Sequence, residues 1–138
     1  MKIAIEAQRI FRPDKHGMDF VALETIRELQ KRNDGNEYYI IVAPGKDHCL
    51  KESANLSIVE VACPTYPLWE QIALPLAVKR LGADLLHCTS NTAPLCCPVP
   101  LVLTLHDIIY LEPRQQRSPS LYQEMGRHYR RLTVPRIL

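Results

Sequence analysis

The sequence predicts an α/β fold in which a mostly parallel sheet is flanked by helices. Short segments rich in β-branched residues alternate along the chain with longer segments whose apolar residues recur at helical spacing. The chain has 138 residues, of which 46% are hydrophobic, and this is enough for one domain with a buried core. Such alternation is typical of strands joined by crossover helices, which place the strands parallel to one another.

The first half of the chain predicts three strands and one helix. The first strand alternates, with Ile3 and Ile5 on one face. The helix has an apolar stripe that ends at Leu29, and Asp19 near its start suits a helix N-terminus. The second strand is rich in β-branched and aromatic residues, and in the third strand apolar and polar residues alternate. These elements are expected over residues 2–7, 18–32, 37–43 and 56–62, with a loop over residues 8–17.

The second half predicts two helices and two strands. A kink or a late start is expected in the first of these helices, because Pro75 lies inside it. The second strand is almost continuously apolar, which is typical of a strand buried on both faces. The last helix is basic and amphipathic and is expected to be interrupted at Pro135. The elements are expected over residues 68–81, 84–89, 100–106 and 120–138, with a loop over residues 90–98 and a polar linker over residues 113–119.

Composition and charge exclude several classes of protein. A net charge of +2 is too small for a dedicated nucleic-acid binder, so no nucleic-acid partner is expected. The five cysteines are odd in number and lack C-x-x-C spacing, which favours a reducing compartment. The adjacent Cys96 and Cys97 are interpreted as small apolar loop residues rather than as a redox pair. Because no signal peptide or membrane-spanning apolar run is visible, a cytoplasmic protein is expected.

Several common catalytic motifs are missing from the sequence. The loop before the first helix has a single glycine, Gly17, so neither G-x-G-x-x-G nor a phosphate-binding loop with its lysine is present. This argues against a dinucleotide-binding Rossmann enzyme and against a phosphate-loop NTPase. A G-x-S-x-G elbow is also missing. The five histidines do not fall in a metal-binding spacing such as H-E-x-x-H, so no metal is expected.

The carboxyl ends of the strands are where parallel α/β sheets bind their ligands. This rule brings three segments to one rim: the loop that ends at Gly17, the loop over residues 90–98, and the pair His106-Asp107. The pair has two other interpretations. Some metal-dependent phosphohydrolases use such a pair, but on helices with further His and Asp ligands that this chain lacks. Alternatively, Asp107 caps a turn and His106 is a satisfied, half-buried histidine.

Four segments together resemble the amino-terminal half of the retaining GT-B glycosyltransferases, in the large family 4 group. They are a first strand followed by a glycine loop, an aromatic-Glu-Gln and Leu-Pro helix with a following Asp-Leu-Leu-His strand, an apolar strand ending in His-Asp, and a basic helix. In this sequence they read KIAIEAQRIF, LWEQIALPLAVKRLGADLLHCTSNTAP, PLVLTLHDIIYLEP and YRRLTVPRIL. The order and spacing of these segments carry the resemblance, which spans nearly the whole chain.

The resemblance implies a domain organisation and an activity. Residues 1–138 would form an incomplete, Rossmann-like, acceptor-side domain, and the donor-binding domain with its Glu-x7-Glu motif would be absent from the chain. The implied activity is retaining transfer of a hexose from a nucleotide sugar to a glycan or lipid-linked acceptor, without a metal or other cofactor. The chain alone would be inactive. A non-catalytic α/β binding module, or an inactive truncated gene product, is the alternative.

Site residues follow from the resemblance position by position. Gly17 and Met18 match the loop whose backbone N–H groups approach the donor diphosphate at a helix N-terminus. Asp19 stands where many members have a second glycine, and its carboxylate would repel a diphosphate unless it caps the helix. His106 matches the histidine that contacts the transferred sugar. Three further residues are expected to orient the loop or to line the acceptor cleft, namely Asp107, Asn91 and Thr92.

Two further contacts are expected of the carboxyl-terminal helix over residues 120–138. Its arginines, including Arg127, Arg130 and Arg131, are expected either to touch the anionic inner face of a membrane or to form a solvated helix face. The sheet would also be incomplete on one side, so this helix is expected to pack poorly or to serve self-association.

Overall fold

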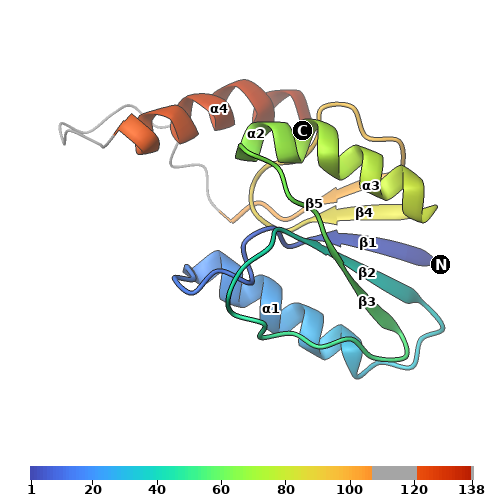
Figure 1. The fold of residues 1–138 in the computed structure, drawn as a ribbon. Coiled ribbons are helices and arrows are strands. Elements are labelled where there is room, and N and C mark those ends of the chain that lie inside the picture. Colours follow the sequence, from blue (N-terminus) through green and yellow to red (C-terminus); the bar gives the residue numbers. More distant parts are fainter. Residues whose placement is uncertain (107–120, 138) are drawn as a thin grey trace.

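A sheet of five parallel strands organises the chain (Figure 1). The computed structural model describes residues 1–106 and 121–137. Within these residues the strand order is β3-β2-β1-β4-β5. The strands are β1 (Lys2–Glu6), β2 (Glu37–Val42), β3 (Leu56–Glu60), β4 (Leu85–Cys88) and β5 (Leu101–Leu103). This Rossmann-like arrangement confirms the predicted α/β fold.

Helices cover both faces of the sheet. The helix α1 (Gly17–Gln30) lies on one face, and the segments that connect β3 to β4 lie on the other together with α4 (Figure 1). These connecting segments form one continuous helical run of α2 (Tyr66–Leu68), the π-helical turn η1 (Trp69–Ala73) and α3 (Leu74–Leu81). The carboxyl-terminal helix is α4 (Leu121–Ile137).

Two apolar cores follow from the alternation of side chains along the strands. Ile5 and Ile40 point to the face covered by α1, where they pack with Leu23 and other buried residues. Their neighbours Ala4 and Ile41 point to the opposite face and pack with Trp69 and other residues of the helical run. Because successive strand residues face opposite sides of a sheet, one alternating strand serves both cores.

The strand order reverses between β1 and β4. From β1 the chain proceeds through β2 to β3 on one side, and then crosses to β4 and β5 on the other side. In open parallel sheets this point of reversal leaves a crevice at the carboxyl ends of the two central strands. The loops after Glu6 and Cys88 therefore flank the position where a ligand is expected.

Of the two outcomes predicted for the helix around Pro75, a kink or a late start, the late start is wrong. The helix begins at Tyr66 rather than late, and the irregularity takes the form of a π-helical turn directly before the proline. In this turn the backbone N–H of Leu74 donates to the carbonyl of Trp69, five residues back. A proline ring clashes with the carbonyl four residues earlier in a regular helix, and a wider turn is a common way to relieve such a clash.

Two further predictions for the second half of the chain are wrong. β5 is short and is not buried on both faces: Val102 is 45% exposed, because among the described residues β5 pairs only with β4. The helix α4 runs through Pro135 to Ile137, although the proline cannot donate a backbone hydrogen bond, so the predicted interruption is not seen. Near the end of this helix Val134 is fully buried, so this part of the helix packs against the rest of the chain. Self-association through the helix stays a prediction. Among the described residues, no helix is both long and apolar enough to cross a membrane.

Candidate functional site

A short loop after β4, residues 89–92, forms the centre of the candidate site, and we call it the rim loop. Its first residue is tied to the end of β1, because the Thr89 hydroxyl donates to the backbone carbonyl of Glu6 at 2.8 Å. The Thr89 N–H also points to Glu6 Oε2 at 3.4 Å. Asn91 is buried and has a φ of 67°, a left-handed conformation that asparagine tolerates better than most residues. The loop thus lies at the point where the strand order reverses.

His106 is exposed and is held by this rim loop. Its backbone N–H donates to Asn91 Oδ1 at 2.5 Å, and its Nε2 lies 2.8 Å from the backbone carbonyl of Thr89. A carbonyl oxygen can only accept a hydrogen bond, so Nε2 must carry the proton. In the neutral ring Nδ1 is then the acceptor. The structure therefore places an imidazole at the rim in a defined tautomer, with one nitrogen left to accept a proton or a hydrogen bond.

Glu70 is a buried carboxylate that gathers three hydroxyl groups. Its Oε2 accepts from Tyr66 at 2.6 Å and from Thr92 at 2.7 Å, and its Oε1 accepts from Tyr129 at 2.6 Å. Burial raises the pKa of Glu70, and the hydroxyl donors oppose that shift. Glu70 thereby joins the helical run, the rim loop and α4 at one point.

Gln71 reinforces the same junction on the loop that follows. Its Nε2 donates to the carbonyl of Ala93 at 3.1 Å and to the Tyr129 hydroxyl at 3.0 Å. Its Oε1 accepts from the N–H of Leu95 at 2.8 Å. The Glu-Gln pair of the sequence is therefore fully engaged in holding the segment after β4.

Glu6 is a second buried carboxylate at the end of β1. Its Oε1 accepts from the N–H of Gln8 at 2.9 Å. Burial, and secondarily the negative charge of Glu70, raises its pKa from the ordinary value of 4.5 to about 7, while Arg9 acts in the opposite direction. Two buried acidic groups whose pKa values are raised by burial therefore lie at the rim, an arrangement that is common at functional sites.

The start of α1 joins this site through Arg9. The Asp19 carboxylate accepts the backbone N–H of His16 at 2.9 Å and so caps the helix. Asp19 lies 3.6 Å from the Nε of Arg9 and 3.5 Å from that of Arg12. Arg9 also lies over the ring of Tyr66, 6.0 Å from its centroid. Arg9 and Arg12 thus lie next to the buried carboxylate of Asp19, the residue that stands in place of a second glycine in the loop.

The structure places the predicted site residues in two groups. Asn91, Thr92 and His106 are brought together by the rim loop. Gly17 and Met18 are the first two residues of α1. A side chain added at Gly17 would meet nothing within 4 Å, so protein packing does not explain the glycine there. Asp107 lies outside the described residues.

Several residues of the site escaped the sequence analysis. Glu6 and Tyr66 were not singled out, and Glu70 entered only through the resemblance. A carboxylate on an otherwise apolar, alternating strand was the available signal for Glu6. For Tyr129, whose hydroxyl reaches Glu70 across 59 positions of the chain, the local sequence gives no signal.

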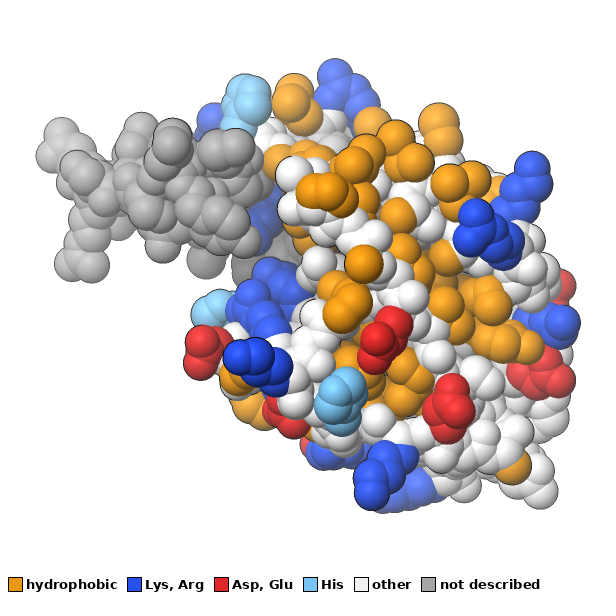
Figure 2. All heavy atoms as spheres, in the orientation of Figure 1, with side chains coloured by type: hydrophobic (Ala, Val, Ile, Leu, Met, Phe, Trp, Pro, Cys, Tyr) orange, Lys and Arg blue, Asp and Glu red, His pale blue; other side chains and the backbone are white. Residues whose placement is uncertain are grey.

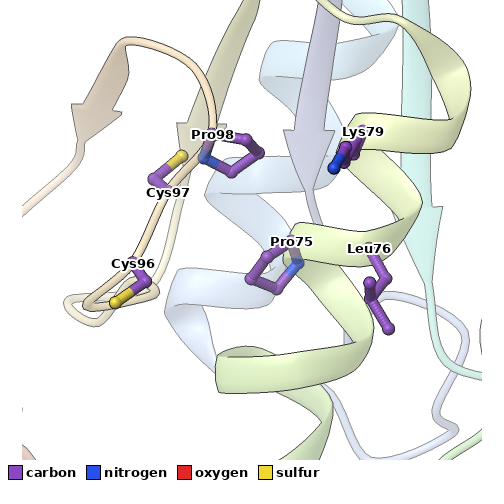
Figure 3. Close-up of a pocket in the computed structure, with 6 residues that line it drawn as sticks. All are labelled: Pro75, Leu76, Lys79, Cys96, Cys97 and Pro98. Atoms are coloured by element: carbon purple, nitrogen blue, oxygen red, sulfur yellow. The ribbon is translucent and has the colours of Figure 1, made fainter.

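A second surface feature lies away from the rim residues. Figure 2 shows hydrophobic side chains gathered over the helical run. A hollow with a volume of about 290 Å³ lies beside α3, and Figure 3 shows the residues that line it. Both vicinal cysteines line it and are free thiols whose sulfur atoms point in different directions (Figure 3). The hollow is lined by Pro75, Leu76, Lys79, Cys96, Cys97 and Pro98. With a largely apolar lining and one cation, it offers less chemistry than the rim.

Comparison with known proteins leaves the family of this chain open. No family model matches the chain, and no curated protein matches it. Within the described part of the chain, no three His, Cys, Asp or Glu side chains converge as metal ligands would.

Proposed function

We propose that the chain is the acceptor-side domain of a retaining, nucleotide-sugar-dependent glycosyltransferase of GT-B architecture. The observation that carries this proposal is the imidazole of His106, held at the strand-order reversal in one tautomer by the rim loop. Its Nδ1 can accept a hydrogen bond from a hydroxyl of the transferred sugar. The resemblance of the sequence points to the same residue.

The start of α1 supports a diphosphate at the same rim. Gly17 and Met18 present backbone N–H groups at the positive end of the helix dipole, where anions are favoured. Asp19 does not oppose this role, because it caps the helix and two arginines surround it. Charge that develops on the leaving diphosphate can thus be stabilised by fixed donors.

Product analysis separates this enzyme from a non-catalytic binding module. The protein encoded by the complete reading frame should release nucleoside diphosphate from its donor, and the new glycosidic bond should keep the anomeric configuration of the donor. The 138-residue chain alone should not transfer sugar, because a second domain is needed to hold both reactants in one closed site. Binding of nucleotide sugars without turnover by the full-length protein would favour the binding module. Sugar transfer by the 138-residue chain alone would contradict the proposal that a second domain is needed for catalysis.

A lipid-linked acceptor is favoured by one surface observation. Leu68, Ile72 and Leu76 follow one another at four-residue intervals on the helical run, and they are 42%, 53% and 52% exposed. Lys79 and Arg80, both exposed, follow on the same run. Exposed apolar side chains next to cations suit the surface of an anionic membrane.

Co-sedimentation with anionic vesicles tests this contact. Ile72→Ser together with Leu76→Ser should abolish most of the binding. A matched control is Phe20→Ser together with Val21→Ser, because these residues are 53% and 52% exposed on α1, which covers the other face of the sheet. Equal binding by the two double variants would dismiss the membrane contact.

A further inference from the structure

Two buried glutamates hold the rim loop from opposite ends. At the start of the loop, the Thr89 N–H points to the carboxylate of Glu6. At its end, the Thr92 hydroxyl donates a hydrogen bond to the carboxylate of Glu70. The loop lies between strands and helices that are themselves packed in the core, so both anchors are fixed. The left-handed Asn91 lies between the anchors. A residue in that conformation is retained where the surrounding structure determines the backbone, and the two anchors provide this constraint.

The same short loop provides the contacts that orient His106. Among the described residues, the hydrogen bonds of His106 run to the carbonyl of Thr89 and to the side chain of Asn91. Because the histidine is exposed, packing does little to orient its ring. A change in the backbone of the rim loop must therefore change the position and the tautomer of the imidazole.

Holding a loop with a buried carboxylate is energetically unfavourable. Burying a charged group is unfavourable unless it is well compensated, and apolar packing can replace buried polar contacts without loss of stability. Three hydroxyl donors and the nearby Arg9 compensate Glu70. Directional hydrogen bonds fix the backbone of the loop more closely than apolar contacts would. This precision matters only if something on the loop must be positioned.

We propose that Glu70 is a positioning residue that acts through Thr92 and the rim loop to hold the imidazole of His106 in one orientation and one tautomer. This inference rests on the proposed function, in which the orientation of His106 serves its contact with the transferred sugar. The hydrogen bonds that link Glu70, Thr92, the rim loop and His106 are present in the free chain. This positioning can therefore be tested without donor or acceptor, and its failure is distinguishable from a failure of the proposed enzyme activity.

The decisive substitution is Thr92→Val, which removes the hydroxyl but keeps the shape of the side chain. The ring nitrogens of His106 are observed by long-range proton–nitrogen NMR on the ¹⁵N-labelled chain at pH 8, above the ordinary titration range of histidine. The wild type should show the Nε2–H tautomer. In Thr92→Val the two tautomers should mix, and amide exchange at Asn91 and His106 should rise about tenfold or more. Thr25→Val is the matched control, because the Thr25 hydroxyl bonds only locally to Val21 on α1.

Two further variants separate the hydrogen bond from general loosening of the structure. Thr92→Ser restores a hydroxyl and should restore the wild-type signals of His106. Glu70→Met in a Thr92→Val background should change His106 no further, since both substitutions remove the same bond. The proposal is overturned if folded Thr92→Val leaves the ring and the exchange rates unchanged. It is also overturned if Thr92→Ser disturbs His106 as much as Thr92→Val does. If Thr92→Val does not fold, the outcome with Thr92→Ser decides.

Discussion

Replacing Glu6 with glutamine should remove the pH dependence that this buried carboxyl imposes on stability. Glu6 is 1% exposed at the end of β1, where it accepts backbone N–H groups of Gln8 and Thr89. Glu70 faces it with a like charge and Arg9 with an opposite one, and burial is the largest influence. Glutamine has nearly the same shape but cannot ionise. Its single side-chain oxygen can keep the bond from Gln8 at 2.9 Å, whereas its NH2 group cannot accept the longer contact from the Thr89 N–H at 3.4 Å.

The size and sign of the effect follow from the pKa of Glu6. Its value in the folded chain is about 7, compared with an ordinary value of 4.5. The folded state therefore binds this proton more tightly than the unfolded state does. The stability from Glu6 is fully present below pH 4.5 and is lost as the pH rises through 7. Since one pKa unit corresponds to about 1.4 kcal/mol, about 3 kcal/mol of unfolding free energy is lost by pH 8.

Urea denaturation of the wild type and of Glu6→Gln at pH 4 and pH 8 measures this effect. The variant should match or fall below the wild type at pH 4, and relative to the wild type it should gain about 3 kcal/mol by pH 8. Comparing the two proteins cancels the titration of all other groups. Glu60→Gln on β3, where the side chain is exposed, should show no such gain. Parallel loss of stability by wild type and Glu6→Gln between the two pH values would refute the reasoning.

Substitutions at three positions test the packing that positions the site, each by urea denaturation. Gly45→Ala should destabilise the chain by about 1–3 kcal/mol, because a Cβ there would lie 2.3 Å from the carbonyl oxygen of Phe11; unchanged stability would show that this approach is not so close. Trp69→Phe should lower the free energy of unfolding by about 2 kcal/mol or more, because it leaves a cavity and removes the indole N–H that donates to the Val61 carbonyl at 2.8 Å. A smaller loss would mean that this hydrogen bond contributes little. Gly82→Ala should lose about 1 kcal/mol, because Gly82 has a φ of 64°, and Gly82→Asn should lose less; the reverse order would contradict the assigned conformation.

The strands could be predicted because their pattern is local. In β1 and β2 the alternation of apolar residues places one set on each face of the sheet, and the structure shows a core on each face. The carboxyl-end rule then predicted the rim at which His106 lies. Local pattern failed at β5, where the apolar sequence is that of a buried strand. Burial there depends on how many neighbours the strand has, and this is not a property of its own residues.

The buried acids show why the inner part of the site could not be predicted. Glu70 binds Thr92 and Tyr129, which lie 22 and 59 positions further along the chain. No periodicity connects such residues, so only the folded backbone brings them together. The π-helical turn over Trp69–Ala73 is a further case, because a proline predicts an irregular helix without specifying its form.

Sugar transfer by the proposed two-domain glycosyltransferase, with and without the imidazole of His106, tests the proposed function most directly. Loss of one such contact in a water-excluded site removes about 2–4 kcal/mol of transition-state stabilisation, or roughly a hundredfold or more in rate. His106→Ala should therefore lower turnover by about this factor and leave the melting temperature nearly unchanged. His48→Ala, which removes an exposed histidine packed edge-on against Phe11, is the control and should keep wild-type turnover. Turnover per folded molecule that survives His106→Ala while stability falls would contradict the account and leave His106 a structural residue.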